Sequence, residues 1–249
     1  MNRWSSLLAG AALVLLWEMG CVISEVPSYI LPRPSSVVLT AVVQTPILAR
    51  HGAVTALEII LGLTLALALA VPLSTAMFAK PYLERALSPF LVASQAIPVF
   101  ALAPVLVVWF GYGITSKVVM ATVIIFFPVT VNLLEGFKSC DRRYRQMFRL
   151  MGYPFRDTMV KLYWPWALPY FFAGLKVAVS VATIGAVIGE WVGAQSGLGY
   201  LMIQSNARLK TDMVFAAILW LSVMGLALWW LVGKLAERYA PWNDGDEKI

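Results

Sequence analysis

The sequence predicts an all-α, polytopic membrane protein with about six transmembrane helices. Of its 249 residues, 60% are hydrophobic and only 13% are charged, whereas a soluble domain carries roughly 25% charged residues. The apolar residues form long continuous runs and do not alternate with polar residues, as they would in a membrane β-barrel. We therefore expect one transmembrane domain over residues 1–249.

Six apolar runs are each long enough to cross a hydrocarbon core of about 30 Å as a helix. They cover residues 7–23, 54–79, 90–110, 118–137, 168–188 and 213–235. Gly20-Cys21 in the first run also suggests a lipoprotein signal. Glu18 stands where such a signal requires an apolar residue, so we expect an uncleaved first span.

Two of the segments along the chain contain several prolines. Between the first two runs, Pro34 is followed by Ser35-Ser36, a good helix N-cap pair, and by an amphipathic stretch at 37–49 that is suited to the membrane interface. The third run contains Pro89, Pro98 and Pro104, so it is expected to be kinked or broken. Such breaks are tolerated in lipid where neighbouring helices satisfy the freed backbone groups, which predicts an interior position.

The loop at 138–165 is the longest basic segment between the apolar runs. Cys140-Asp141 can cap a helix that ends at Gly152, because glycine is the residue most suited to a helix C-terminus. Pro154 then opens a second short helix, and Pro165 marks the entry to the next span. The loop is therefore expected to form a helix–glycine–helix elbow.

Lysine and arginine are concentrated on one side of the predicted spans, which sets the orientation. The loop 138–165 carries Lys138, Arg142, Arg143, Arg145, Arg149, Arg156 and Lys161. Because positive residues favour the cytoplasmic side, this loop and both termini are predicted to be cytoplasmic. The loop then either meets a protein partner or lies as a basic helix on anionic lipid headgroups. The polar tail at 243–249 is expected to be disordered.

The sequence lacks the patterns that several function classes require. It has two cysteines, one histidine and no metal-ligand spacing. It has no phosphate-binding Gly-Lys-Ser/Thr loop and no hydrolase or zinc-protease motif, so we expect no enzyme activity and no cofactor in this chain. The net charge of +6 lies at span ends, which argues against nucleic acid. An ion-driven carrier would show inverted repeats and paired charges at the midplane, and neither is present.

The elbow resembles the cytoplasmic loop of permease subunits of bacterial ABC importers. In that family a Glu-Ala-Ala triplet precedes a glycine at fixed spacing, and a Leu-Pro pair follows. Here Gln146, Met147 and Phe148 stand for the triplet, Gly152 has the family spacing, and Trp164-Pro165 stands for Leu-Pro. The loss of the glutamate would replace its charge contact by a neutral hydrogen bond from Gln146. Phe148 in place of alanine implies a deeper slot on the partner.

The resemblance covers nearly the whole chain. Residues 30–35 and 96–113, with the tight turn Gly111-Tyr112-Gly113, are similar to permeases of the nitrate/sulfonate/taurine type. Residues 94–98, 126–130 and 189–193 look most like permeases for hydroxymethylpyrimidine, a thiamine precursor. Permeases for sulfonate, taurine or nitrate-type anions are the alternative, and an ion-coupled secondary transporter is the more distant one.

The resemblance implies a homodimer in the bacterial inner membrane, with a transport path at the subunit interface. Two ATP-binding cassette ATPases, which would bind ATP and magnesium, would grip the elbow at Gln146, Met147, Phe148, Met151 and Gly152. A periplasmic or lipid-anchored substrate-binding protein would deliver the solute, and membrane lipid would surround the spans.

A small pyrimidine needs a few hydrogen-bonding groups in an otherwise apolar path. The candidates are Ser94 and Gln95 in the third run, Asn132 in the fourth and Glu190 at the outer end of the fifth. Helix–helix hydrogen bonding explains such residues equally well, and Glu190 is also explained as an interfacial residue beside the anchor Trp191. Among the other ionisable residues, Glu58 is expected to snorkel to the interface, whereas Glu18 and Lys176 face either helix neighbours or the path.

Overall fold

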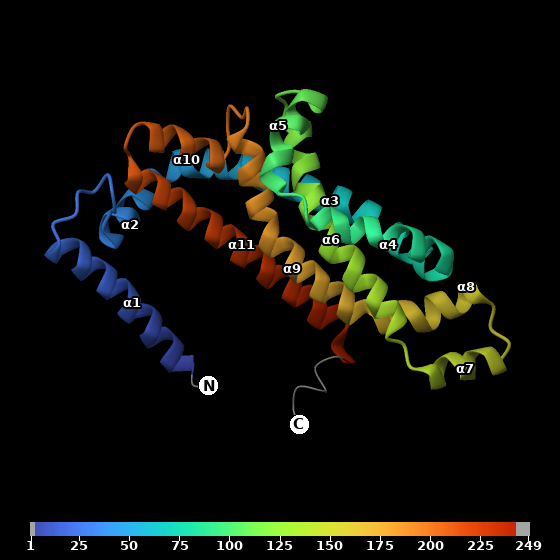
Figure 1. Cartoon of the computed structure of the whole chain (residues 1–249). Coiled ribbons are helices and arrows are strands. Elements are labelled where there is room, and N and C mark those ends of the chain that lie inside the picture. Colours follow the sequence, from blue (N-terminus) through green and yellow to red (C-terminus); the bar gives the residue numbers. More distant parts are fainter. Residues whose placement is uncertain (1–2, 243–249) are drawn as a thin grey trace.

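The computed structural model of the chain describes residues 3–242, so the predicted disorder of 243–249 lies outside the described residues. Within 3–242 every regular element is a helix (Figure 1). Four helical stretches are long and apolar enough to cross a membrane, or five if the bent pair α4–α5 is one span. They are α3 (Thr45–Ala79), α6 (Ile114–Lys138), the continuous stretch Phe155–Trp191 and α11 (Thr211–Tyr239).

Five of the six predicted apolar runs are helical throughout and the third is two helices separated by a break, so the count of six spans is approximate. The first run forms α1 (Arg3–Ile23), whose apolar part, Leu8–Ile23, is shorter than the four long spans. Its described contact with the bundle includes Trp17, whose ring centroid is 5.6 Å from that of Phe215 in α11. Several of its leucines, including Leu13 and Leu16, are exposed, so α1 has an apolar surface that this chain does not cover.

The core is built from α3, α6, α9 (Trp164–Trp191) and α11, and the most extensive helix contact joins α6 to α9. Small residues allow this contact: a Cβ on Gly174 would lie 2.6 Å from Asn132 Cβ, and one on Gly136 would lie 2.7 Å from Tyr170 Cβ. Ala121, Ile125 and Ala178 are fully buried in the same core. Close approach at small residues is how helices associate in lipid, where no hydrophobic force drives them together.

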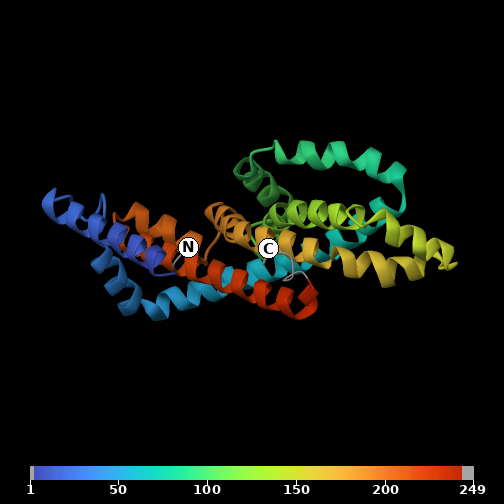
Figure 2. The same cartoon turned by 90° about the horizontal axis from the view of Figure 1, so that it is seen from below.

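The predicted break in the third span is confirmed. Its two halves are α4 (Pro81–Gln95) and α5 (Val99–Phe110), and they are bent by 102° around Ala96–Pro98. The predicted interior position is wrong for α4, which buries none of its residues, whereas α5 buries Ala103, Leu106 and Val107. Seen from below, α4 and α5 lie along the outside of the bundle (Figure 2). At the break the Ala96 amide donates to the Ala93 carbonyl at 3.0 Å and the Ala101 amide to the Pro98 carbonyl at 2.9 Å, so local hydrogen bonds satisfy part of the backbone there.

The segment between the first two spans forms α2 (Pro34–Val43), followed at once by α3, which starts nine residues earlier than the apolar run. Ser35-Ser36 do not cap α2; Arg33 is the N-cap and Pro34 is the first helical residue. Instead, the amide and hydroxyl of Ser35 donate to Glu18, at 3.0 and 2.8 Å. Glu18 therefore joins α1 to α2. Of the two predicted surroundings for Glu18, a helix neighbour or the transport path, the structure shows the helix neighbour.

Pro165 does not interrupt the fifth span. The short helix α8 (Phe155–Thr158) continues through a π-helical turn, Met159–Tyr163, directly into α9. A π turn widens the helix and so removes the clash between a proline ring and the preceding turn. A further helix, α10 (Leu198–Ala207), lies between α9 and α11 and was not predicted, because its glycine-rich start resembles a loop.

Candidate functional site

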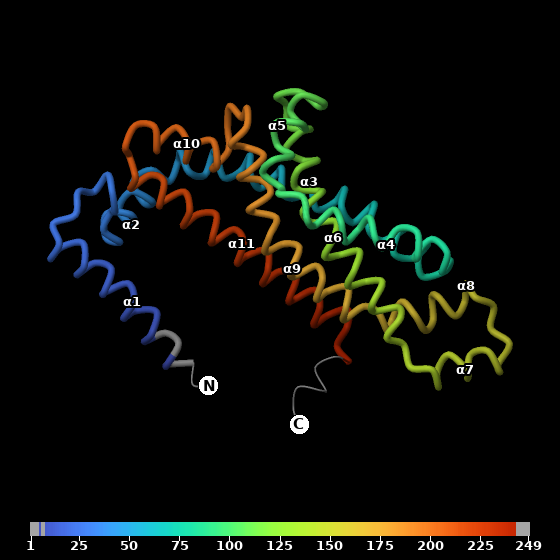
Figure 3. The backbone as a smooth tube through the Cα atoms, viewed as in Figure 1, coloured from blue at the N-terminus to red at the C-terminus, as the bar shows by residue number. Residues whose placement is uncertain are grey.

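The predicted elbow is present at the end of the molecule away from α1 and α2 (Figure 3). Asp141 caps α7 (Arg142–Leu150), accepting a hydrogen bond from the Arg143 amide at 2.8 Å. Gly152 has φ +73°, a value that a residue with a side chain adopts only with strain. The amide of Gly152 donates to the Arg149 carbonyl at 3.0 Å, and that of Tyr153 to Phe148 at 3.1 Å. Pro154 was predicted to be the first residue of the second short helix, and it is instead the N-cap of α8 (Phe155–Thr158).

The elbow has an inner and an outer face. Phe148 faces the chain itself: its ring lies 5.1 Å from that of Tyr153, and it packs on the buried cluster around Phe137 and Cys140. Gln146 and Met147 are exposed, as is Met151 at 61%. Leu150, which is not among the predicted contact residues, is 89% exposed. The exposed apolar residues therefore suit a partner, whereas this placement favours a structural role for Phe148.

Cys140 lies at the base of the elbow and is only 1% exposed. Burial raises the pKa of its thiol, so at neutral pH less of it is the reactive thiolate. Cys21 is buried as well.

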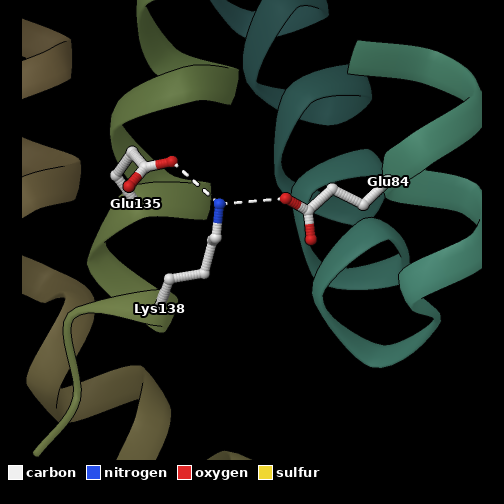
Figure 4. Close-up of polar contacts among 3 residues, drawn as sticks. All are labelled: Glu84, Glu135 and Lys138. Atoms are coloured by element: carbon white, nitrogen blue, oxygen red, sulfur yellow. Dashed lines mark hydrogen bonds and ion pairs between the residues drawn. The ribbon is translucent and has the colours of Figure 1, made fainter.

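The elbow joins α6 at a cluster of three charged side chains (Figure 4). Lys138, the last residue of α6, places its Nζ 2.9 Å from Glu84 Oε1 of α4 and 3.1 Å from Glu135 Oε1. Among the described residues, the Lys138–Glu84 contact is the one ion pair that joins different helices. It therefore ties the outlying α4 to the residue from which the chain leaves α6 toward α7.

Reversing the charge at Lys138 is expected to loosen this junction. Exposed ion pairs contribute about 0–1 kcal/mol, so Lys138→Gln should lower the thermal inactivation temperature of the purified chain only slightly. Lys138→Glu, which gathers three carboxylates, should lower it further, and adding Glu84→Lys should recover part of the loss. Lys234→Gln, in the exposed pair Lys234–Glu237, is the matched control. A double variant no better than Lys138→Glu would contradict the pairing.

The four residues predicted to line a path are not gathered into one site. Ser94 and Gln95 lie at the end of α4, where the Ser94 hydroxyl donates to the Leu91 carbonyl at 2.7 Å. Asn132 lies at the contact of α6 with α9, and its amide donates to the Pro128 carbonyl of its own helix at 2.7 Å. Glu190 is 1% exposed. Their role in a path stays a prediction.

Two other ionisable side chains have defined surroundings. The expectation that Glu58 snorkels to the interface is wrong: it is 2% exposed, and its carboxyl group lies against that of Glu190. Lys176 in α9 lies with its Nζ 5.2 Å from the ring centroid of Trp229 in α11, an arrangement in which the ring face attracts the cation.

A groove runs between α9 and α11. It has a volume of about 630 Å³. The lining residues are Ser180, Thr183, Ile218, Leu221, Ser222, Gly225, Leu226 and Trp229. A smaller cavity of about 210 Å³ between the same helices is lined in part by Lys176, Gly233 and Glu237. The lining of the groove is apolar except for the hydroxyl groups of Ser180, Thr183 and Ser222. These hydroxyl groups were not predicted as site residues, because serine and threonine are common inside membrane helices.

Comparison with known proteins agrees with this architecture. Residues 58–241 match the family described as binding-protein-dependent transport system inner membrane component. The chain is 41% identical to a probable ABC transporter permease protein of Haemophilus influenzae, covering 94% of this chain and 95% of that protein. It is 40% identical to the formylaminopyrimidine transport permease protein ThiX of Halalkalibacterium halodurans, covering 93% and 92%.

A third relative is the riboflavin transport system permease protein RibX of Chloroflexus aurantiacus, 35% identical over 97% of this chain and 92% of that protein. Permeases named for aliphatic sulfonates and taurine match at lower identity. These relatives are transport components and not enzymes, and the family does not fit the rival interpretation as an ion-coupled carrier. The chain belongs to the family of binding-protein-dependent transport inner-membrane components and is a multi-pass ABC transporter permease.

Proposed function

We propose that this permease imports a small pyrimidine of the hydroxymethylpyrimidine or formylaminopyrimidine class. The observation that carries the proposal is the 40% identity, over nearly the whole chain, to a permease named for formylaminopyrimidine. The match at residues 94–98, 126–130 and 189–193 to hydroxymethylpyrimidine permeases points the same way.

The groove between α9 and α11 supports this substrate class. An uncharged aromatic solute needs apolar surface and a few hydrogen-bonding groups, and Ser180, Thr183 and Ser222 offer hydroxyl oxygens there. Trp229 offers an aromatic face beside them. Lys176 is the one observation that favours the alternative, a sulfonate, taurine or nitrate-type anion, because its ammonium group suits a negative charge.

Uptake into proteoliposomes decides between the substrates. The permease, its ATPase and its own binding protein are reconstituted, and ATP-dependent entry of labelled hydroxymethylpyrimidine is measured. The proposal expects entry that unlabelled formylaminopyrimidine inhibits and that riboflavin and taurine do not. Uptake of taurine with no uptake of either pyrimidine, by the same active vesicles, would overturn it.

Membership of the family implies an ATP-binding cassette ATPase and a substrate-binding protein as partners. We propose further that two copies of this chain form a homodimer surrounded by membrane lipid, with the solute delivered from the outside. The ATPases, which would hold ATP and magnesium, would bind the elbow at Gln146, Met147, Leu150, Met151 and Gly152. The exposed apolar side of α1 suits a second copy of the chain, because this chain leaves it uncovered.

Both termini and the elbow are proposed to be cytoplasmic. The start of α1, the end of α11 and α7 lie toward the same side of the molecule in Figure 1, with α2 and α10 toward the other, and α7 carries many of the positive residues.

Thiol labelling tests this orientation. Arg143→Cys, at an exposed position, is introduced into a chain with Cys140→Ser. In spheroplasts it should not react with a membrane-impermeant maleimide, and after lysis it should react quickly. The native Cys140 should react slowly even after lysis, and faster as the pH rises, because burial raises the pKa of its thiol. Labelling of Arg143→Cys in intact spheroplasts would reverse the topology.

A further inference from the structure

The start of α10 is held by side chains of two other helices. The first amides of a helix have no partner within it, and here four of them donate to α3 or α9. They are Gly197 to His51 Nδ1 at 3.1 Å, Leu198 to Thr55 Oγ1 at 2.9 Å, and Gly199 and Tyr200 to Glu190 Oε2. The attachment of α10 is therefore made by three side chains from outside the helix.

Glu190 is central to this attachment. Besides the two amides of α10, its carboxylate accepts a hydrogen bond from the Thr55 hydroxyl at 2.6 Å. A carboxylate is favoured at a helix N-terminus, where the unpaired amides carry partial positive charge. Gly197 and Gly199 leave the necessary room, because a Cβ on Gly197 would collide with the Glu190 carboxyl group and one on Gly199 would lie 3.0 Å from Oε2. The sequence Gly197-Leu198-Gly199 thus fits this one side chain.

Glu58 adds a second carboxyl group to the same arrangement. It is 2% exposed, and its side chain forms a hydrogen bond with that of Glu190. Two ionised carboxylates would repel each other, so this contact holds when Glu58 carries a proton and donates it to the Glu190 carboxylate. Its Oε2 is buried and receives no hydrogen bond among the described residues, which suits an oxygen that donates and does not accept. Lys117, which lies nearby, donates from its Nζ to the carbonyls of Tyr112 and Gly113.

We propose that Glu190 is a positioning residue that docks α10 onto α3 and α9, and that Glu58 supports this docking by donating a hydrogen bond to Glu190. Glu190 accepts from the amides of α10, and Glu58 holds the Glu190 carboxylate in the orientation that these amides require. The position of α10 therefore depends on side chains of α3 and α9 and not on a cap from its own sequence. This inference uses the proposed orientation for one point only, which is that α10 lies on the outer side of the membrane.

Hydrogen exchange at the amides of residues 197–200 measures the docking directly. The intact complex of permease and ATPase is placed in lipid nanodiscs, and exchange is followed by mass spectrometry. Glu190→Ala should speed exchange of these amides by about tenfold or more, because their acceptor is lost. Glu190→Gln, which keeps the size and one acceptor oxygen, should give a smaller increase and serves if the alanine variant does not assemble.

Two variants at Glu58 test its hydrogen bond to Glu190. The amide of Glu58→Gln can donate to Glu190 as the protonated carboxyl group does, so exchange should stay close to the native rate. Glu58→Leu has a similar size and cannot donate, so exchange should rise several-fold. Glu25→Gln, at an exposed position between α1 and α2, is the control and should not change exchange. Unchanged exchange in both Glu190 variants would overturn the docking role, and equal exchange in Glu58→Gln and Glu58→Leu would overturn the role of the hydrogen bond. Neither readout of exchange depends on the identity of the substrate.

Discussion

Gly152→Pro should abolish ATP-driven uptake while the chain still inserts in the membrane. Gly152 has φ +73°, and proline holds φ near −65°, so the elbow cannot keep its turn. Proline also removes the amide that donates to the Arg149 carbonyl. Because Gly152 is exposed and a Cβ there would contact nothing within 4 Å, the defect would arise from the backbone and not from a clash. The measurement is uptake per assembled complex in proteoliposomes.

Two further variants separate the shape of the elbow from its surface. Gly152→Ala fits sterically and only strains the backbone, by about 1–2 kcal/mol, so it should reduce uptake partially. Leu150→Asp leaves the backbone intact and replaces a side chain that is 89% exposed, so it should leave the isolated permease stable while weakening its binding to the ATPase. Full uptake by Gly152→Pro with a normally bound ATPase would show that the elbow does not transmit the effect of ATP.

Gly174→Leu should prevent the assembly of a stable permease. Gly174 lies where α9 crosses α6, and a Cβ there would come within 2.6 Å of Asn132 Cβ and 2.8 Å of the Pro128 carbonyl. The second contact is with backbone, so relief requires the two best-packed helices of the core to separate. Overpacking of this kind typically costs about 1–3 kcal/mol for small additions, and leucine adds several carbon atoms.

A pair of alanine substitutions provides the sharper comparison for Gly174. Replacing glycine by alanine inside a helix normally favours the helix by about 1 kcal/mol. Gly225→Ala in α11 should follow this rule, because its Cβ would meet only Thr183 Cγ2 at 3.5 Å. Gly174→Ala should instead lower the thermal stability of the detergent-purified permease. Equal stability of the two variants would mean that α6 and α9 are less closely packed than described.

The elbow was predictable in detail because its signals are local. Asp141 as a cap, Gly152 at a left-handed turn and Pro154 after it each follow from the chemistry of one residue. The broken third span was likewise predictable from Pro98. The direction in which Phe148 faces was not predictable, because it depends on the distant cluster around Phe137. The same holds for α4, whose burial depends on neighbours that the local pattern does not specify.

The buried network at α10 could not be predicted from spacing along the chain. His51 and Thr55 are separated from Gly197 and Leu198 by most of the sequence. Glu58 was expected at the interface because an isolated carboxylate near a span end usually reaches water. Its actual position against Glu190 follows from how α3 crosses α9, which no single-helix pattern reports. Glu190 was selected from the sequence as a path candidate, which stays a prediction, and its hydrogen bonds are with Thr55 of α3 and with the amides of α10.

We expect the ATPase to bind this permease at the exposed side of the elbow. The most direct measurement is site-specific photocrosslinking in inner-membrane vesicles that contain the assembled complex. A photoreactive amino acid at position 150, which is 89% exposed on α7, should form an ultraviolet-dependent adduct with the ATPase subunit. The same amino acid at position 209, which is 67% exposed after α10, should form none. An adduct from position 209 and none from position 150 would contradict the account.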